Sequence, residues 1–255
     1  MPYLEEARDK VRWGRARKSR VIDEKEKDIT AHHEAGHALV QVLLPDTDPL
    51  HKVSIIPRGP MGGATFSLPE KDRYLYTRNY CSALICVLFG GRVAEEIFCG
   101  DVSSGAQNDI AQATDIARKM VLDWGMSDKL GLINYANEER RMMPLNLQGK
   151  EYSDQTAQLI DAEVRAIVDH ARAKTRKLIE ANRDKLERLA QALLTYETLS
   201  AEEVQEIFEG KELKKPSVTG LLAREQAKTV PQATDDTTST PPMPKGEPPP
   251  LPQPG

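Results

Sequence analysis

Two histidines spaced four residues apart give this sequence its clearest chemical signal. His33 and His37 lie in the stretch AHHEAGHALV, residues 31–40. On an α-helix, residues with this spacing differ by about 40° in azimuth and by one turn along the axis. Two imidazoles placed in this way can bind one zinc ion, for which histidine nitrogen is a common ligand. The spacing therefore predicts a metal site on one side of a helix.

Glu34 directly follows the first of these histidines. Its carboxylate would project to the side of the metal, where it can reach a bound water without ligating the ion. Zinc lowers the pKa of a bound water toward about 7. A carboxylate in this position can take the proton as the water attacks a carbonyl and can later protonate the leaving amine. We expect Glu34 to be a catalytic base.

A catalytic zinc site needs a third protein ligand. The metzincin continuation would place glycine at position 40 and histidine at position 43, but Val40 and Leu43 stand there, which excludes that class. The remaining candidates are downstream carboxylates, namely Glu95, Glu96, Asp101, Asp109 and Asp115.

Helical phase ranks Asp109 and Glu95 above the other carboxylates. Asp109 falls on the border of the buried face predicted for a helix over 105–124, whereas Asp115 points to the opposite side. That face is formed by Ile110, Ala113, Ala117, Met120, Val121 and Trp124. Glu95 lies in an apolar face of a helix over 79–98, where it could ligate zinc or accept the free N–H of a ligand histidine. Phase alone leaves both open, and Asp109 could instead be an acid that favours a helix N-terminus.

The elements that must position these residues are mostly helical. Apolar periodicity predicts helices over 24–44, 79–98 and 105–124, a long amphipathic helix over 157–179, one over 186–194, and a last one from Ser200. Ser104 with Gln107, and Ser200 with Glu203, have the spacing of capping boxes. The segment HKVSIIP, residues 51–57, alternates as a short strand does, and residues 64–68 could pair with it. We predict a mainly α fold with a small β element.

Composition excludes several other classes. The formal net charge of −4 calls for neither nucleic acid nor an anionic membrane as a partner. No stretch approaches the roughly 20 apolar residues needed to cross a bilayer. Cys81, Cys86 and Cys99 lack metal-type spacing, so we expect them to pack as small hydrophobes in a reducing compartment. His32, His51 and His170 lie outside the motif and are interpreted as structural or surface residues.

Several motifs together resemble the peptidase domain of FtsH-type ATP-dependent zinc metalloproteases, a family of AAA+ proteases. These are HEAGHA at 33–38, IPRG at 56–59, GGRVAEEIFCGDVSSGAQND at 90–109 and WGMSDKLG at 124–131. The resemblance covers roughly residues 5 to 209. It implies one Zn²⁺ per chain held by His33, His37 and Asp109, with Glu34 as the base and Glu95 orienting a ligand histidine.

The same resemblance implies a helical metallopeptidase domain, a homo-hexameric ring and unfolded or tagged proteins as substrates. By analogy, the strand that contains Val53, Ser54, Ile55 and Ile56 would border the active-site cleft. An extended substrate could then pair with its edge through main-chain hydrogen bonds. We therefore expect substrate binding at these four residues.

Three segments are predicted: a linker over 1–22 that would follow an ATPase module, a zinc metallopeptidase domain over 23–210, and a disordered Pro-rich tail over 211–255. The chain has no phosphate-binding loop of the form GxxxxGK[ST]. The alternatives are a fragment of a longer protein and a free-standing peptidase that lacks its own motor. We expect a fragment or split gene product, with ATP acting only through an ATPase module in cis or in trans. The expected location is the cytoplasm or the cytoplasmic face of the inner membrane, with membrane contact only through missing segments.

Two other functions stay open at this point. The chain could be a catalytically inactive, zinc-stabilised scaffold or ring-assembly module, or it could be a zinc hydrolase for a non-peptide substrate. A closed structural site would have four protein ligands and no need for a carboxylate at position 34. Residues 137–150, which include Met142-Met143-Pro144, depart from the family pattern, but they lie away from the motif.

Overall fold

The structure is a computed structural model that describes residues 10–11, 23–57, 62–68, 73–136 and 152–217. The chain divides into two units, residues 1–218 and 219–255, and every described residue lies in the first. Residues 137–150, which depart from the family pattern, lie outside the described residues. So do nearly all of the predicted linker over 1–22 and most of the predicted tail.

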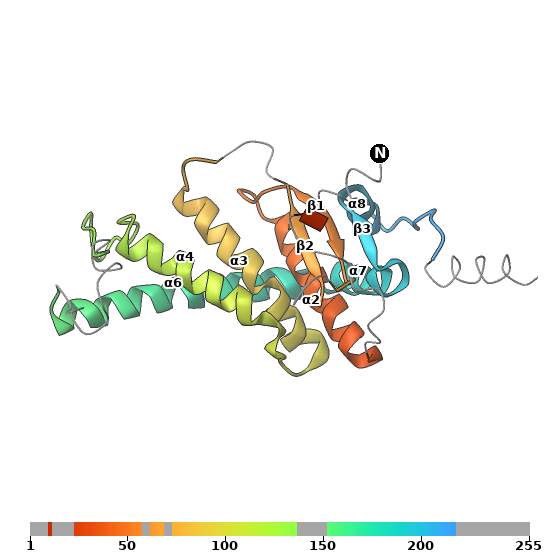
Figure 1. Cartoon of the computed structure of the whole chain (residues 1–255), viewed down its shortest axis with the longest axis horizontal. Helices are drawn as coiled ribbons and strands as arrows, with labels where there is room; N and C mark the ends of the chain where they lie inside the picture. The colour runs from red at the N-terminus through yellow and green to blue at the C-terminus, as the bar shows by residue number, and fades with distance from the viewer. Residues whose placement is uncertain (1–9, 12–22, 58–61, 69–72, 137–151, 218–255) are drawn as a thin grey trace, which may run out of the picture. The chain divides into compact units, whose positions relative to one another are not determined.

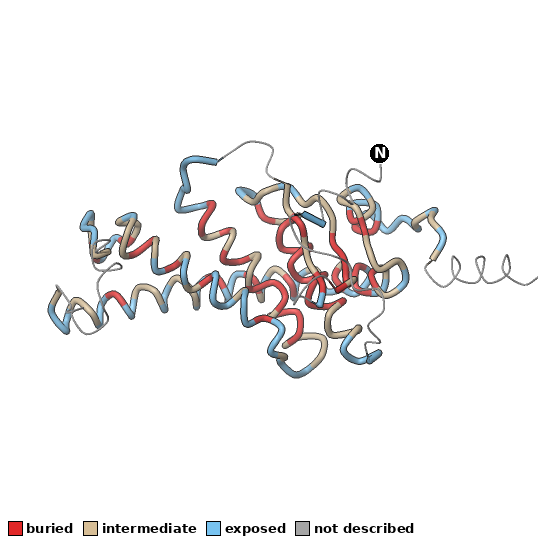
Figure 2. The backbone as a smooth tube through the Cα atoms, in the orientation of Figure 1, coloured by how far each residue is buried: buried red, intermediate tan, exposed pale blue. Residues whose placement is uncertain are grey.

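Helix α2 (Glu24–Leu43) is the central element of the fold and confirms the helix predicted over 24–44. Every residue from Ala31 to Gln41 is buried, and the run of buried positions follows most of the helix in Figure 2. Helix α3 (Arg78–Ala94) and helix α7 (Arg183–Tyr196) both pack against it (Figure 1). A helix that is buried on all sides needs small or apolar residues around its whole circumference.

Two glycines set the distance between α2 and α3. A Cβ atom added at Gly36 would lie 2.3 Å from the carbonyl oxygen of Gly90, and one added at Gly90 would lie 2.6 Å from the carbonyl oxygen of Gly36. The two backbones are thus in direct contact. This is the close packing that a glycine inside a helix indicates, since glycine costs about 1 kcal/mol relative to alanine there.

Between α3 and α4 (Gln107–Leu122) the chain makes two short helical turns. A π-helical turn η1 (Glu95–Cys99) continues α3 and ends at Gly100, whose φ is 69°. A 3₁₀ turn η2 (Ser104–Ala106) then leads into α4. The predicted capping box at Ser104 and Gln107 is wrong. The capping serine is Ser103, whose side chain accepts a hydrogen bond from the N–H of Gly105.

The C-terminal helices complete the packing. Helix α6 (Asp154–Ala181) runs beside α3 and α4 (Figure 1), as the amphipathic pattern predicts. After α7 come strand β3 (Thr198–Ser200) and helix α8 (Ala201–Phe208). The predicted capping box at the start of α8 is confirmed, because Ser200 and Glu203 exchange both of its hydrogen bonds.

The β element is a three-stranded antiparallel sheet in the order β2-β1-β3. Strand β1 (Leu50–Ser54) pairs with β2 (Ala64–Ser67), which confirms the predicted partner. The prediction that β1 offers a free edge to a substrate is wrong. Sequence reasoning missed β3, which pairs with β1 on its other side at Lys52, Val53 and Ser54.

This pairing also buries the residues predicted to bind substrate. Val53, Ser54 and Ile55 are buried, and only Ile56 is partly exposed. The N–H of Ile55 donates to the carbonyl oxygen of Glu197 at 2.9 Å.

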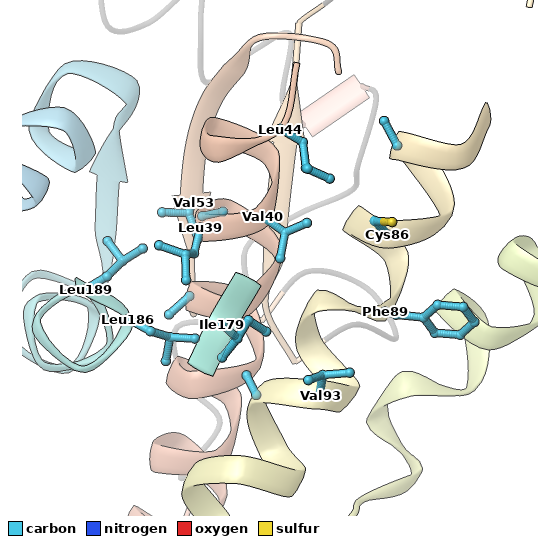
Figure 3. Close-up of a cluster of buried hydrophobic side chains, with 14 of the residues drawn as sticks. Leu39, Val40, Leu44, Val53, Cys86, Phe89, Val93, Ile179, Leu186 and Leu189 are labelled. Atoms are coloured by element: carbon cyan, nitrogen blue, oxygen red, sulfur yellow. The ribbon is translucent and has the colours of Figure 1, made fainter. Parts of the chain in front are cut away.

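The main core fills the space between the helices and one face of the sheet. Figure 3 shows side chains from α2, α3, α6 and α7 that meet in it. Its largest fully buried apolar residues include Leu39, Ile85, Ile179, Leu186, Leu189, Leu193 and Leu199. Cys81 and Cys86 are buried free thiols, as predicted. None of the described helices combines the length and the apolar character that a membrane span requires.

The contact between α2 and α3 predicts that alanine at position 36 lowers the stability of the protein, although alanine favours a helix by itself. Alanine at position 36 should stabilise an isolated helix by about 1 kcal/mol. We expect Gly36→Ala to destabilise this protein by about 3 kcal/mol, near the upper end for an overpacked core, because the new methyl group meets backbone that cannot move aside. Urea unfolding followed by circular dichroism measures the change.

Gly62→Ala is the matched control. A Cβ atom there would come no closer than 3.7 Å to Thr30, an ordinary contact distance, so its unfolding midpoint should stay near that of the wild type. A Gly36→Ala protein as stable as the wild type would contradict the direct backbone contact.

Candidate metal centre

Three side chains from two helices converge on one point. His33 and His37 lie on successive turns of α2, and Asp109 lies in the first turn of α4. The Nε2 atoms of the two histidines are 3.0 Å apart. The Oδ2 atom of Asp109 is 3.3 Å from Nε2 of His33 and 3.5 Å from Nε2 of His37. These three atoms form a nearly equilateral triangle.

The triangle has the size that a zinc ion requires. With Zn–N and Zn–O distances of about 2.0–2.2 Å and tetrahedral angles, ligand atoms lie about 3.3–3.5 Å apart. All three measured separations fall close to this value. Two imidazole nitrogens and a carboxylate oxygen are also a typical catalytic donor set for zinc. The residues present therefore fit the ion in both size and chemistry.

The outer nitrogens of both imidazoles are held by acceptors. Nδ1 of His33 lies 2.7 Å from Oε1 of Glu95, and Nδ1 of His37 lies 2.7 Å from the carbonyl oxygen of Val87. A carbonyl or carboxylate oxygen at this distance requires a donor, so both Nδ1 atoms carry hydrogen. In the neutral rings the lone pairs of the two Nε2 atoms then face one another. A cation between them removes this conflict.

The surrounding charges favour a cation at the same point. Burial lowers the pKa of His33, but the carboxylates of Asp109 and Glu95 outweigh it and raise that pKa to about 10. Burial raises the pKa of Asp109, yet its close contacts with His33 and His37 hold that pKa well below its usual range. The cluster is therefore built to surround positive charge, which zinc can supply while both imidazoles remain neutral.

Glu95 lies in the layer behind the ligands. Its side chain is 1% exposed, and its Oε1 atom faces Nδ1 of His33 rather than the Nε2 triangle. Ser103 donates to it through both its N–H and its hydroxyl. Burial raises the pKa of Glu95, but the bonds from His33 and Ser103 keep it below the usual value. Of the two candidate carboxylates, Asp109 thus belongs to the group of side chains that could hold a metal ion, whereas Glu95 contacts a histidine of that group from the other side of its ring.

The other candidate carboxylates are engaged elsewhere. Glu96 pairs with Arg172 and Arg176 of α6, Asp115 pairs with Lys119, and Asp101 accepts the N–H of Val102. The buried face predicted for the helix over 105–124 is wrong at its two ends. Ile110 is 38% exposed and Trp124 is 39% exposed, although Ala113, Ala117, Met120 and Val121 are buried as expected.

Glu34 projects from α2 toward the sheet. It is buried but does not belong to the group of side chains that can share a metal ion. The hydroxyl of Thr65 on β2 donates to its Oε2 atom at 2.8 Å. Burial raises the pKa of Glu34, although His37, His33 and Thr65 act in the opposite direction. A carboxylate with a raised pKa beside a metal site is suited to exchange protons.

Sequence reasoning missed the residues that make room for this arrangement. A Cβ atom at Gly91 would lie 2.5 Å from the ring of His33, and one at Gly63 would lie 2.8 Å from Cγ of Glu34. The signal in the sequence that could have revealed them is the glycine at each position, because a missing side chain leaves room for a neighbouring one. By contrast, His32 is structural as interpreted, since its ring nitrogens contact the carbonyl oxygen of Asp28 and the carboxylate of Glu187.

Comparison with known proteins agrees with a zinc site, because the similar proteins are named as zinc metalloproteases. Residues 20–207 match the model of Peptidase family M41. The chain is 52% identical over 219 residues to "ATP-dependent zinc metalloprotease FtsH 2" of Methylacidiphilum infernorum, covering 85% of this chain and 34% of that protein. It is 46% identical over 216 residues to "ATP-dependent zinc metalloprotease FtsH" of Cupriavidus metallidurans, covering 85% and 33%. The chain thus spans about a third of the length of these relatives.

The contact between Gly91 and His33 leads to a prediction for metal binding. Gly91→Ala changes no ligand, but the new methyl group would displace the imidazole of His33. We expect the purified variant to bind zinc at least tenfold more weakly than the wild type, as loss of ligand orientation typically produces. Competition with a chromophoric chelator measures the affinity.

Gly62→Ala again serves as the control and should bind zinc with the affinity of the wild type. Circular dichroism verifies that Gly91→Ala is folded before its affinity is compared. Unchanged zinc affinity in a folded Gly91→Ala protein would contradict the packing of Gly91 against the ring of His33.

Proposed function

The chain belongs to peptidase family M41 as an FtsH-type peptidase domain, and we propose from this premise that it is a zinc metalloendopeptidase for unfolded or tagged proteins. In this proposal His33, His37 and Asp109 hold one Zn²⁺, and Glu34 is the general base. The main support is geometric. Three ligand atoms converge at zinc-like separations, and the buried carboxylate of Glu34 stands beside them without joining the group.

A bound zinc ion would act as a Lewis acid that makes water nucleophilic near neutral pH. Glu34 would accept a proton from the attacking water and deliver it to the nitrogen of the departing amine. Its burial supports this role, because a carboxylate with a raised pKa can both accept and return a proton. Thr65 would hold one carboxylate oxygen, so that the other is directed at the reacting atoms.

The acceptors at the Nδ1 atoms of the two histidines would keep both imidazoles in place during turnover. Glu95 and the carbonyl oxygen of Val87 would fix the ring orientation of His33 and His37. Acceptors of this kind also raise the basicity of a ligand imidazole. The chain's own contribution is therefore a prepared set of donors and a separately oriented base.

An extended substrate would pair with the outer side of β2. This strand has β1 on only one side within the described sheet. Its Thr65 contacts Glu34, which would bring a peptide paired along β2 close to the base. Main-chain pairing depends little on side chains and suits a protease that accepts many sequences. The role assigned to Val53, Ser54, Ile55 and Ile56 would then be to support β2 from behind.

The competing functions make different demands on Glu34. A zinc-stabilised scaffold would be expected to close its site with a fourth protein ligand, whereas three side chains meet among the residues that the structure describes. A scaffold would also gain nothing from a buried carboxylate beside the site. A zinc hydrolase for a non-peptide substrate would use the same residues and is separated only by a test with protein.

The relatives are named as ATP-dependent proteases. We extend the proposal to an ATPase module, in cis or in trans, that would deliver unfolded protein to this domain. A homo-hexameric ring at the cytoplasmic face of the inner membrane, or in the cytoplasm, is the matching arrangement. Substrates without stable structure would bypass the need for unfolding, and they are therefore the right choice for assays of this chain.

We expect Glu34→Gln to retain zinc and to lose cleavage of casein by at least a hundredfold. The amide keeps the shape of the side chain but cannot take the proton, and general-base catalysis is typically worth about 10²–10⁴ in rate. Release of dye from labelled casein measures activity, and metal analysis of the same sample measures zinc.

The result also separates the three functions. Zinc-dependent casein cleavage by the wild type that a chelator abolishes would exclude the inactive scaffold and support a peptidase. Full activity in Glu34→Gln would refute the assigned base. A wild-type protein that binds zinc but leaves casein and short peptides intact would favour the scaffold or the non-peptide hydrolase.

Thr65→Val should lower kcat for a fluorogenic peptide by about ten- to a hundredfold, with little change in KM. The substitution removes the hydroxyl that donates to Glu34, and a hydrogen bond to a charged group is worth about 1.5–3 kcal/mol. Thr65→Ser, which retains the hydroxyl, should stay within a few-fold of the wild type. An equal loss of kcat in both variants would mean that the fit of the Thr65 side chain, rather than its hydrogen bond to Glu34, is what matters.

A further inference from the structure

We propose that Ser103 is a positioning residue for the metal site. It holds Glu95 against His33, and through the same hydroxyl it joins Glu95 to the turn from which the helix of Asp109 begins. The inference rests on the proposed function, because it concerns how the chain keeps the three zinc ligands in register. Ser103 touches neither the metal ligands nor a reacting atom, and acts only through Glu95.

The contacts of Ser103 are directional. Its N–H donates to Oε2 of Glu95 at 2.8 Å, and its hydroxyl donates to Oε1 of Glu95 at 3.0 Å. Oε1 is the oxygen that lies 2.7 Å from Nδ1 of His33. The N–H of Gly105 donates to the hydroxyl oxygen of Ser103 at 3.0 Å. Because this oxygen is already an acceptor there, its single proton is left for Glu95.

Glu95 needs this support because its side chain is almost fully buried. A buried carboxylate is costly unless each oxygen is hydrogen-bonded. The nearest guanidinium nitrogen, Nη1 of Arg92, is 3.8 Å from Oε2, and within the described part of the chain it has no hydrogen-bond partner. Apart from His33 itself, the hydrogen bonds that orient Glu95 therefore come from Ser103.

These bonds connect the two halves of the metal site. One half is His33 on α2, and the other is Asp109 on α4. The path runs from the ring of His33 through Glu95 to Ser103 and then through Gly105 into the turn η2 that leads to α4. Loss of the hydroxyl would leave Oε1 of Glu95 held by His33 alone, with only the N–H of Ser103 still bonded to Oε2. The ring of His33 and the start of α4 would then be less firmly fixed relative to each other.

The test is the affinity of the whole chain for Zn²⁺, measured by competition with a chromophoric chelator. We expect Ser103→Ala to bind ten- to a hundredfold more weakly, the range typical for partners that orient metal ligands. Ser103→Thr retains the hydroxyl and should restore affinity to within a few-fold. Ser104→Ala is the matched control, since the neighbouring serine is exposed and no described contact uses its hydroxyl.

The absorption spectrum of the Co²⁺-substituted protein gives a second readout that a general loss of stability would not change. The d–d bands should shift in Ser103→Ala and match the wild type in Ser103→Thr and Ser104→Ala. Wild-type affinity and spectrum in Ser103→Ala, or an equal loss in Ser104→Ala, would overturn the proposal. Should Ser103→Ala not fold, Gly105→Ala replaces it, because its Cβ would lie 3.0 Å from the Ser103 hydroxyl and push it aside.

A double-mutant cycle tests the route through Glu95. In a Glu95→Gln background, Ser103→Ala should cost less than a further twofold in zinc affinity, because the group it orients is already altered. A full additional ten- to hundredfold loss would show that Ser103 acts by another route. The two proposals fail separately: a wild-type chain that binds no zinc refutes the metal site, whereas a zinc-binding wild type with an unaffected Ser103→Ala variant refutes only the role of Ser103.

Discussion

The structure depends on the direct backbone contact between α2 and α3. Gly36 and Gly90 bring the two helices so close that no side chain fits between them at this point. Only at this distance can the carbonyl oxygen of Val87 and the carboxylate of Glu95 reach the imidazoles of His37 and His33. A wider separation would leave both Nδ1 atoms without acceptors. The packing of small residues therefore determines which ring nitrogens are available to a metal.

The site that results is a set of mutually dependent ionisable groups that are buried or half-buried. Glu95, Asp109 and Glu34 bring three carboxylates to the same region as two imidazoles. Each would be unfavourable alone, and each is stabilised by a partner that another element supplies. Because ligand binding to such a site is linked to folding, zinc should contribute to the stability of the domain as well as to its chemistry. Zinc binding would thus depend on the packing of the helices and would in turn stabilise that packing.

The sequence predicted the parts of this site that a helical period determines. The spacing of His33 and His37 places both on one side of α2 whatever the rest of the fold does. It could not decide between Asp109 and Glu95, because helical phase describes one helix and the choice depends on how α3 and α4 are joined. The π-helical turn η1 and the 3₁₀ turn η2 make that joint, and neither has a clear sequence period.

The sequence also could not reveal strand β3 or show that β1 has a partner on both sides. Here too the outcome depends on how distant elements pack. A strand of three residues such as β3, set between two helices, has too few residues to show alternation. Without it, β1 looked like an edge strand. Pairing between segments 144 or more residues apart, such as Ser54 with Thr198, is decided by tertiary packing and leaves no local signal. The fold class, which depends on long periodic segments, was correct for that reason.

The position of Glu34 explains why α2 must be buried on all sides. Adjacent residues on a helix differ by about 100° in azimuth, so Glu34 cannot point the same way as His33. The histidines face the turn η1, which carries Glu95, and helix α4, which carries Asp109, whereas Glu34 faces β2 and Thr65. A remaining side of the helix packs against α7. A helix that holds both the histidine pair and Glu34 in fixed orientations therefore needs structured partners on several sides.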